Sequence, residues 1–116
     1  MKAELELEYD EDTLMFVRIS LTGDQISTNF MFEIPKHSTE DFVSLLELIS
    51  CMESGKEFYW LLCRNDGDTF VRTDGTKTHF NVSQYGARIG SKSIISVDNS
   101  IVLPVFKELR QIIQKS

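Results

Sequence analysis

Alternation of apolar and polar side chains, interrupted twice by helical spacing, is the pattern that most limits how this chain can fold. Residues 3–9 alternate apolar side chains with three glutamates. A period of two residues is typical of a β-strand with one face on a core and the other in water. Apolar runs follow at 14–21 and 26–34, and Pro35 ends the third run because proline cannot donate to a sheet. The first third of the chain is therefore predicted to form three strands.

Two later segments repeat apolar residues at helical spacing. The first follows the capping residues Ser38 and Thr39 and stops before Gly55, which can adopt the positive φ that often ends a helix. The second begins at Asn99 or Ser100 and runs to the end of the sequence. The side chains that we predict to be buried are Phe42, Leu45, Leu46 and Ile49 in the first helix, Phe106, Leu109 and Ile113 in the second, and Trp60 and Leu62 in the sheet.

Four further strands are predicted between the helices, at residues 58–63, 69–73, 76–85 and 93–98. The first of them is apolar throughout, which is typical of a strand covered on both faces. Asn65-Asp66-Gly67 and Asp74-Gly75 have the composition of hairpin turns. The order of three strands, a helix, four strands and a helix predicts an α+β fold. We expect an antiparallel, meander-rich sheet of about seven strands, with both helices packed on one side.

A weak internal repeat divides the chain near its middle. Residues 12–18 (DTLMFVR) resemble residues 68–72 (DTFVR), and the two helices carry Phe, Leu and Ile at the same spacing. We predict one domain over 1–116, because 116 residues is a common domain size. Half-repeats at 1–54 and 55–116 are a hypothesis, and chance similarity of two amphipathic hairpins explains the pattern equally well.

The two halves differ in charge. Residues 1–54 carry 12 acidic and 3 basic side chains, whereas residues 55–116 carry 6 acidic and 9 basic ones. The formal net charge of −6 argues against a nucleic-acid-binding protein that neutralises phosphates, and against adhesion to an anionic membrane. Two cysteines in apolar runs and the absence of a secretory leader predict a cytoplasmic protein with reduced thiols.

The acidic residues concentrate at the start of the chain. The segment contains Glu4, Glu6, Glu8, Asp10, Glu11 and Asp12. One interpretation is a docking surface that attracts a basic protein partner. The other is charge on an edge strand, which prevents sheets of different molecules from pairing. The two interpretations are compatible, since a charged edge can also be a docking face.

A second candidate site lies on the predicted strand 76–85 and near it. Its members are His79, Asn81, Ser83 and Tyr85, with Arg72 or Arg88 as a contact for an anion. Such a polar group can line the groove of a small enzyme or a ligand-binding protein. A half-exposed sheet face accounts for the same residues without any ligand.

Known catalytic and metal-binding motifs were not identified in the sequence. It has no Gly-x-Ser-x-Gly, and neither histidine stands at ligand spacing from a cysteine or a carboxylate. We therefore expect no cofactor and no metal. The leading hypothesis is a non-catalytic protein-binding module of the inhibitor or immunity-protein type, as a monomer or a homodimer. The alternatives are the small enzyme or ligand-binding protein and a self-associating structural subunit.

Overall fold

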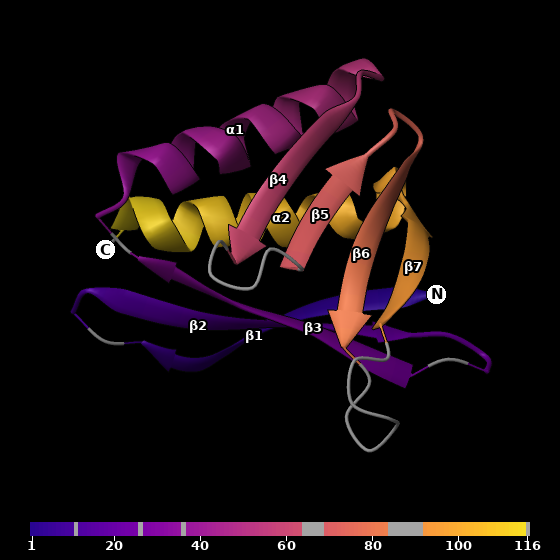
Figure 1. Ribbon diagram of the computed structural model, residues 1–116, viewed down its shortest axis with the longest axis horizontal. Coiled ribbons are helices and arrows are strands. Elements are labelled where there is room, and N and C mark those ends of the chain that lie inside the picture. Colours follow the sequence, from indigo (N-terminus) through magenta and orange to yellow (C-terminus); the bar gives the residue numbers. More distant parts are fainter. Residues whose placement is uncertain (11, 26, 36, 64–68, 84–91, 116) are drawn as a thin grey trace.

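The computed structural model describes residues 1–116 apart from 11, 26, 36, 64–68, 84–91 and 116 (Figure 1). The described elements follow the predicted order. The first half holds β1 (Lys2–Asp10), β2 (Leu14–Thr22), β3 (Ser27–Pro35) and α1 (Thr39–Ser54). The second half holds β4 (Phe58–Cys63), β5 (Thr69–Thr73), β6 (Lys77–Ser83), β7 (Lys92–Asp98) and α2 (Asn99–Lys115). Within the described residues, neither helix is long and apolar enough to cross a membrane.

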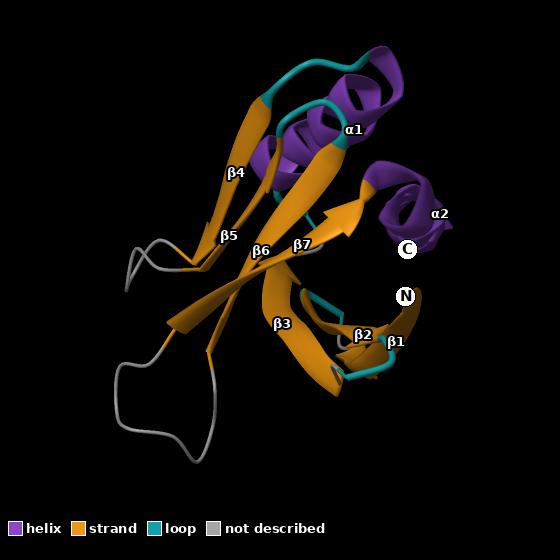
Figure 2. Cartoon of the chain, turned by 90° about the vertical axis from the view of Figure 1, so that its right-hand side faces the viewer, coloured by secondary structure: helices purple, strands orange, loops and turns teal. Residues whose placement is uncertain are grey.

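The described strands form two antiparallel sheets rather than one. Their orders are β1-β2-β3 and β4-β5-β6-β7, so each strand pairs with its neighbours in the chain. The α+β class, the element order and the meander connections are thereby confirmed. The division falls at α1, since β3 before this helix and β4 after it are not hydrogen-bonded to each other. β3 therefore lies across β4 and β6 instead of pairing with β4 (Figure 2).

Both helices cover the same face of the four-stranded sheet, as the sequence predicts. α1 contacts β4 and β5, and α2 contacts β6 and β7. α2 also contacts β1, so it lies between α1 and the three-stranded sheet (Figure 1). Each sheet is thus covered on one face and keeps its other face toward solvent, where Tyr59, Ile94 and the glutamates of β1 are exposed.

The hydrophobic core takes side chains from both sheets and both helices. The inward residues of β2 alternate with half-buried ones and have no exposed surface. Other buried members of the core are Phe30, Phe32 and Ile34 from β3, Trp60, Val71, Phe80 and Val97 from the four-stranded sheet, and Leu45, Leu48, Ile49, Val102, Phe106 and Leu109 from the helices. The two halves of the chain therefore bury their apolar faces against each other.

Aromatic rings connect the layers of this core. The ring centroids of Phe30 on β3 and Phe80 on β6 are 5.0 Å apart, in an edge-to-face arrangement. Phe80 in turn stacks on Phe106 of α2 at 6.1 Å. A second edge-to-face contact joins Phe32 to Trp60 at 6.2 Å. Aromatic pairs of this kind add stabilisation beyond the area that they bury.

The prediction of the core is wrong at Leu46. This residue is 37% exposed, whereas Leu45 and Leu48 are fully buried. Leu46 lies about 100° around the helix from Leu45, on a flank of α1 that it shares with the half-buried Phe42. The other predicted core residues are buried (Leu45, Ile49, Trp60, Phe106 and Leu109) or half-buried (Phe42, Leu62 and Ile113).

The weak internal repeat occupies equivalent places in the two sheets. Residues 16–18 lie on the second strand of the first sheet and residues 70–72 on the second strand of the other. In both copies the valine, Val17 or Val71, is fully buried, and the phenylalanine and arginine beside it are half-buried on the outer face. The two copies thus place the same residue types on the same faces of their sheets. This agreement is consistent with a duplication of the half-repeat, which stays a hypothesis.

The turn between β5 and β6 rests on the C-terminal end of α1. Gly55 ends the helix with a φ of 74°, and Gly75 in the turn has a φ of 100°. A Cβ atom built at Gly75 would lie 2.5 Å from the carbonyl oxygen of Gly55. Glycine is therefore needed at position 75 both for its backbone conformation and for the close approach of the two segments. The contact fixes the turn, and with it Asp74, against the helix.

We expect Gly75→Ala to destabilise the protein by about 1–3 kcal/mol more than Gly55→Ala, because the new methyl group collides with backbone that cannot move away. Gly55→Ala is the matched control. Its φ is also positive, but a Cβ atom there meets nothing within 4 Å, so only the backbone strain of about 1–2 kcal/mol remains. Urea unfolding of the two variants measures the difference. Equal losses would show that the turn does not rest on α1.

Adjacent leucines of α1 provide a second test of the packing. Leu45→Ala removes a fully buried side chain and is expected to cost about 2–5 kcal/mol. Leu46→Ala changes an exposed side chain, so we expect a change of roughly 0.5 kcal/mol. Thermal unfolding followed by circular dichroism measures both. Similar losses from the two substitutions would contradict the described orientation of the helix.

Candidate functional site

The acidic N-terminal segment forms a strand at the edge of its sheet. β1 pairs with β2, and Glu4, Glu6 and Glu8 are exposed on its outer side. Each of the three makes an ion pair within the molecule. Lys2 Nζ lies 2.6 Å from Glu4 Oε1, and Arg18 contacts both Glu6, at 3.7 Å, and Glu8. The edge position supports the interpretation of this charge as protection against pairing between sheets.

The rest of the predicted acidic segment is described only in part. Asp12 is exposed in the turn between β1 and β2. Asp10 ends β1, but its side chain and the whole of Glu11 lie outside the described residues.

The same outer face also carries apolar side chains. Phe16 on β2 and Met31 on β3 are half-buried there. The strand register places Phe16 opposite Glu33, and it places Arg18 between Glu6 on one side and Met31 on the other. The face therefore carries apolar surface on β2 and on the edge strand β3, next to Arg18, and it has glutamates on both edge strands. Protein–protein interfaces combine apolar and polar surface in this way.

The second candidate group lies on the open face of the four-stranded sheet. The register aligns Tyr59, Arg72, His79 and Ser96 in one row across β4, β5, β6 and β7. Side chains of directly paired residues share a face, so this row points away from the helices. Asn81 lies two residues beyond His79 on β6 and therefore on the same face.

The structure thus brings together Arg72, His79 and Asn81 of the predicted group. The side chain of Ser83 and all of Tyr85 and Arg88 lie outside the described residues. Sequence reasoning missed two partners of His79, which are Asp74 and Ser96.

Asp74 organises the turn that precedes β6. Its Oδ1 accepts the backbone N–H groups of Thr76 and Lys77 at 2.9 and 2.8 Å, and the hydroxyl of Thr76 at 3.0 Å. Its Oδ2 lies 3.0 Å from Nε2 of His79. The hydrogen bond from the Lys77 backbone, followed by that from His79, holds the pKa of Asp74 well below its ordinary value. The carboxylate is therefore ionised and fixed in place at neutral pH.

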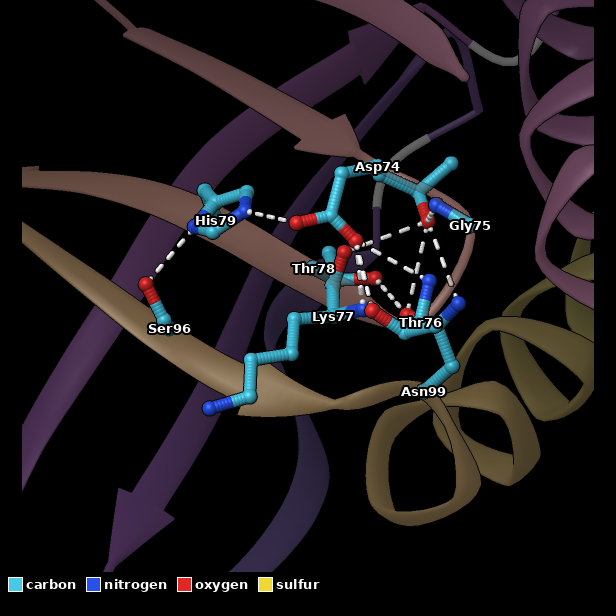
Figure 3. Close-up of polar contacts among 9 residues, drawn as sticks. Asp74, Gly75, Thr76, Lys77, Thr78, His79, Ser96 and Asn99 are labelled. Carbon is cyan, nitrogen blue, oxygen red and sulfur yellow. Dashed lines mark hydrogen bonds and ion pairs between the residues drawn. The ribbon is translucent and has the colours of Figure 1, made fainter. Parts of the chain in front are cut away.

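His79 links this turn to the neighbouring strand β7 (Figure 3). Its Nδ1 lies 2.6 Å from Ser96 Oγ, while its Nε2 faces Asp74. The imidazole is 14% exposed, and Ser96 is exposed at the surface. Because each ring nitrogen has a partner, the ring is held in one orientation within a continuous chain from carboxylate to imidazole to hydroxyl.

Buried polar side chains also stabilise the turn between β5 and β6. Thr73 and Thr78 are fully buried, and Asn99 at the start of α2 is 8% exposed. Asn99 accepts the Thr78 hydroxyl at 2.6 Å and donates to the Thr73 hydroxyl at 3.1 Å. Its backbone N–H donates to the Thr76 carbonyl at 3.0 Å. Both helices therefore hold the turn, α1 through Gly55 and α2 through Asn99.

A hollow that the sequence did not predict lies between the start of α1 and the end of α2. It has a volume of about 270 Å³ and is lined by His37, Ser38, Thr39, Phe42, Ile113 and Gln114. Ser38 Oγ is occupied as the cap of α1, where it accepts the N–H of Asp41 at 3.2 Å. The hollow is far along the chain from both candidate groups and shares no residue with them.

Comparison with known proteins found no matching family model, no matching curated protein and no matching solved structure. Among the described residues, no group of three or more His, Cys, Asp or Glu side chains could hold a metal ion.

We expect Asp74→Asn to lower the melting temperature near pH 7, because the charged acceptor of the turn is lost. The pKa of Asp74 is lower in the folded than in the unfolded chain, so its stabilisation is complete above the ordinary pKa of about 4 and is lost as the pH falls below that value. The difference between variant and wild type should therefore narrow toward pH ~3. Melting curves across this range measure it, with Asp24→Asn, in an exposed turn, as the control.

Proposed function

We propose that this protein is a protein-binding module of the inhibitor or immunity-protein type, and that it docks a basic partner on the outer face of the β1-β2-β3 sheet. The observation that carries the proposal is the arrangement of this face. Glu4, Glu6 and Glu8 point outward along one edge, while Phe16 on the central strand and Met31 on the opposite edge strand add apolar surface to the same face.

The charge of this half of the molecule favours a basic partner. Residues 1–54 carry 12 acidic and 3 basic side chains, and two of those three cations already pair with the glutamates of β1. A surface with an excess of one charge attracts an oppositely charged partner over about a Debye length, roughly 8–10 Å at physiological salt, and so raises the association rate.

The internal ion pairs are compatible with docking. Lys2 and Glu4 are exposed, and Arg18 is about one-third exposed. Ion pairs at exposed positions are individually weak, at about 0–1 kcal/mol. A basic group of a partner can therefore join or replace them at little cost, while Arg18 orients the carboxylates of Glu6 and Glu8 toward the same place.

The test uses two triple variants that change the net charge equally. Glu4→Gln, Glu6→Gln and Glu8→Gln together neutralise the proposed face. Glu47→Gln, Glu57→Gln and Glu108→Gln together neutralise exposed carboxylates on the two helices and in the connection before β4. A partner that cross-links to the wild-type protein is identified and purified, and its association rate with all three forms is measured at low and high salt.

We expect the first triple variant to associate about tenfold more slowly than wild type at low salt, with the difference vanishing at high salt. The second triple variant should behave like wild type. Phe16→Ser should weaken binding at every salt concentration, because it removes apolar surface from the central strand of the face. Equal rates for the two triple variants would contradict docking at this face. Sedimentation of the free protein separates this proposal from the self-associating subunit, which would form oligomers without a partner.

A further inference from the structure

The chain of contacts through Asp74, His79 and Ser96 lies on the other sheet and takes no part in the proposed docking face. Protons in this chain can be placed by elimination. Ionised Asp74 can only accept, so in the neutral form of the imidazole the proton is on Nε2. Nδ1 is then an unprotonated acceptor, and the hydroxyl of Ser96, 2.6 Å away, donates to it. Ser96 Oγ therefore has a base positioned to take its proton.

We propose that Ser96 is a nucleophile for acyl transfer, with His79 as its general base, Asp74 as the residue that orients the imidazole, and a carboxylic ester as the class of substrate. The roles are those of a Ser–His–Asp triad, with the two ring nitrogens exchanged: in the serine-protease arrangement the carboxylate bonds Nδ1 and the serine bonds Nε2. Either nitrogen of imidazole can serve as the base when the other carries the proton.

The surroundings meet two demands of such a site, access to the nucleophile and a fixed base. The nucleophile must be accessible, and Ser96 is exposed on the open sheet face. The base must be held, and His79 is only 14% exposed, with Asp74 fixed by three hydrogen bonds on its other oxygen. The geometry is thus set by the turn and does not depend on a substrate to assemble it.

The reaction balances with water as the only other reactant. Ser96 Oγ attacks the carbonyl carbon of the ester while its proton passes to Nδ1 of His79. The tetrahedral intermediate then expels the alcohol, which takes that proton from the imidazolium, and leaves an acyl-serine. Water, deprotonated by the same nitrogen, attacks the acyl group. The acid is released, and the proton returns to Ser96 Oγ.

The same row indicates which esters suit the site. Arg72 lies on β5, on the side of His79 away from Ser96, and strands are spaced about 5 Å apart. Its guanidinium adds a positive charge to the face on which the ester would lie. The site therefore favours an ester whose acyl part carries a negative charge.

Chemical labelling of the full chain tests the proposal directly. An alkyl fluorophosphonate probe is incubated with the wild-type protein, and the modified residue is located by peptide mass spectrometry. We expect one phosphonyl group on Ser96. The rate should fall at least about 100-fold in His79→Gln, which removes the base, and substantially in Asp74→Asn, which removes the preference for the reactive tautomer. Ser20 is the internal control, because this strand serine contacts Asn29 at 3.0 Å rather than a histidine.

Hydrolysis of two model esters tests the substrate class. The wild type should cleave mono-4-nitrophenyl succinate with a lower KM than 4-nitrophenyl acetate, and Arg72→Gln should abolish this difference without preventing labelling of Ser96.

Labelling of Ser96 no faster than of Ser20 in the wild type would overturn the proposal, and this result needs no variant to fold. Retention of the wild-type labelling rate in a folded His79→Gln variant would overturn it as well. Either failure leaves the docking proposal untouched, because that site lies on the other sheet.

Discussion

The contact between Phe30 and Phe80 is the interaction on which the rest of the architecture depends. These two rings join β3 of one sheet to β6 of the other, and Phe80 continues the stack to Phe106 of α2. The apolar face of a three-stranded meander has to be buried against another layer. The row of fully buried residues on β2 shows that the other half of the chain supplies that layer. The aromatic contacts therefore join the two meanders through one hydrophobic core.

The positions of both candidate sites follow from this core. One face of each sheet is buried in the shared core, so the other face is exposed to solvent. The alternation of side chains along each strand determines which residues lie on that exposed face. On the first sheet these are the glutamates of β1 around Phe16. On the second they are the row that contains His79. The turn at Asp74 has a double role, since it is held by Gly55 of α1 and Asn99 of α2 and also fixes the imidazole against Ser96.

Local pattern was sufficient to predict the elements and the facing of most residues. Alternation in residues 3–9 placed the three glutamates outward, and helical spacing identified both amphipathic helices. Leu46 was misplaced because a period of 3.6 residues gives the direction of a buried stripe, whereas its width depends on which neighbours cover the helix. The division into two sheets was not predictable either, since one sheet and two sheets satisfy the same alternation.

The polar site needed information that no local pattern contains. Asp74-Gly75 was predictable as a turn, and alternation put His79 on the outer face. The partner of His79 on β7 is 17 residues away in the chain, and a shift of one residue in the register between β6 and β7 would have turned Ser96 to the other face. Only the three-dimensional pairing reveals that a carboxylate, an imidazole and a hydroxyl form one chain.

The central claim is that the two sheets share one core, and native-state hydrogen exchange tests it most directly. The account predicts that the most protected amides of β2 and β6 exchange with the same opening free energy, because both require global unfolding. It also predicts that Phe30→Leu lowers that free energy by the same amount in both strands. A loss of protection confined to β1, β2 and β3, with β4 to β7 unchanged, would show that the sheets are independent units and would contradict the account.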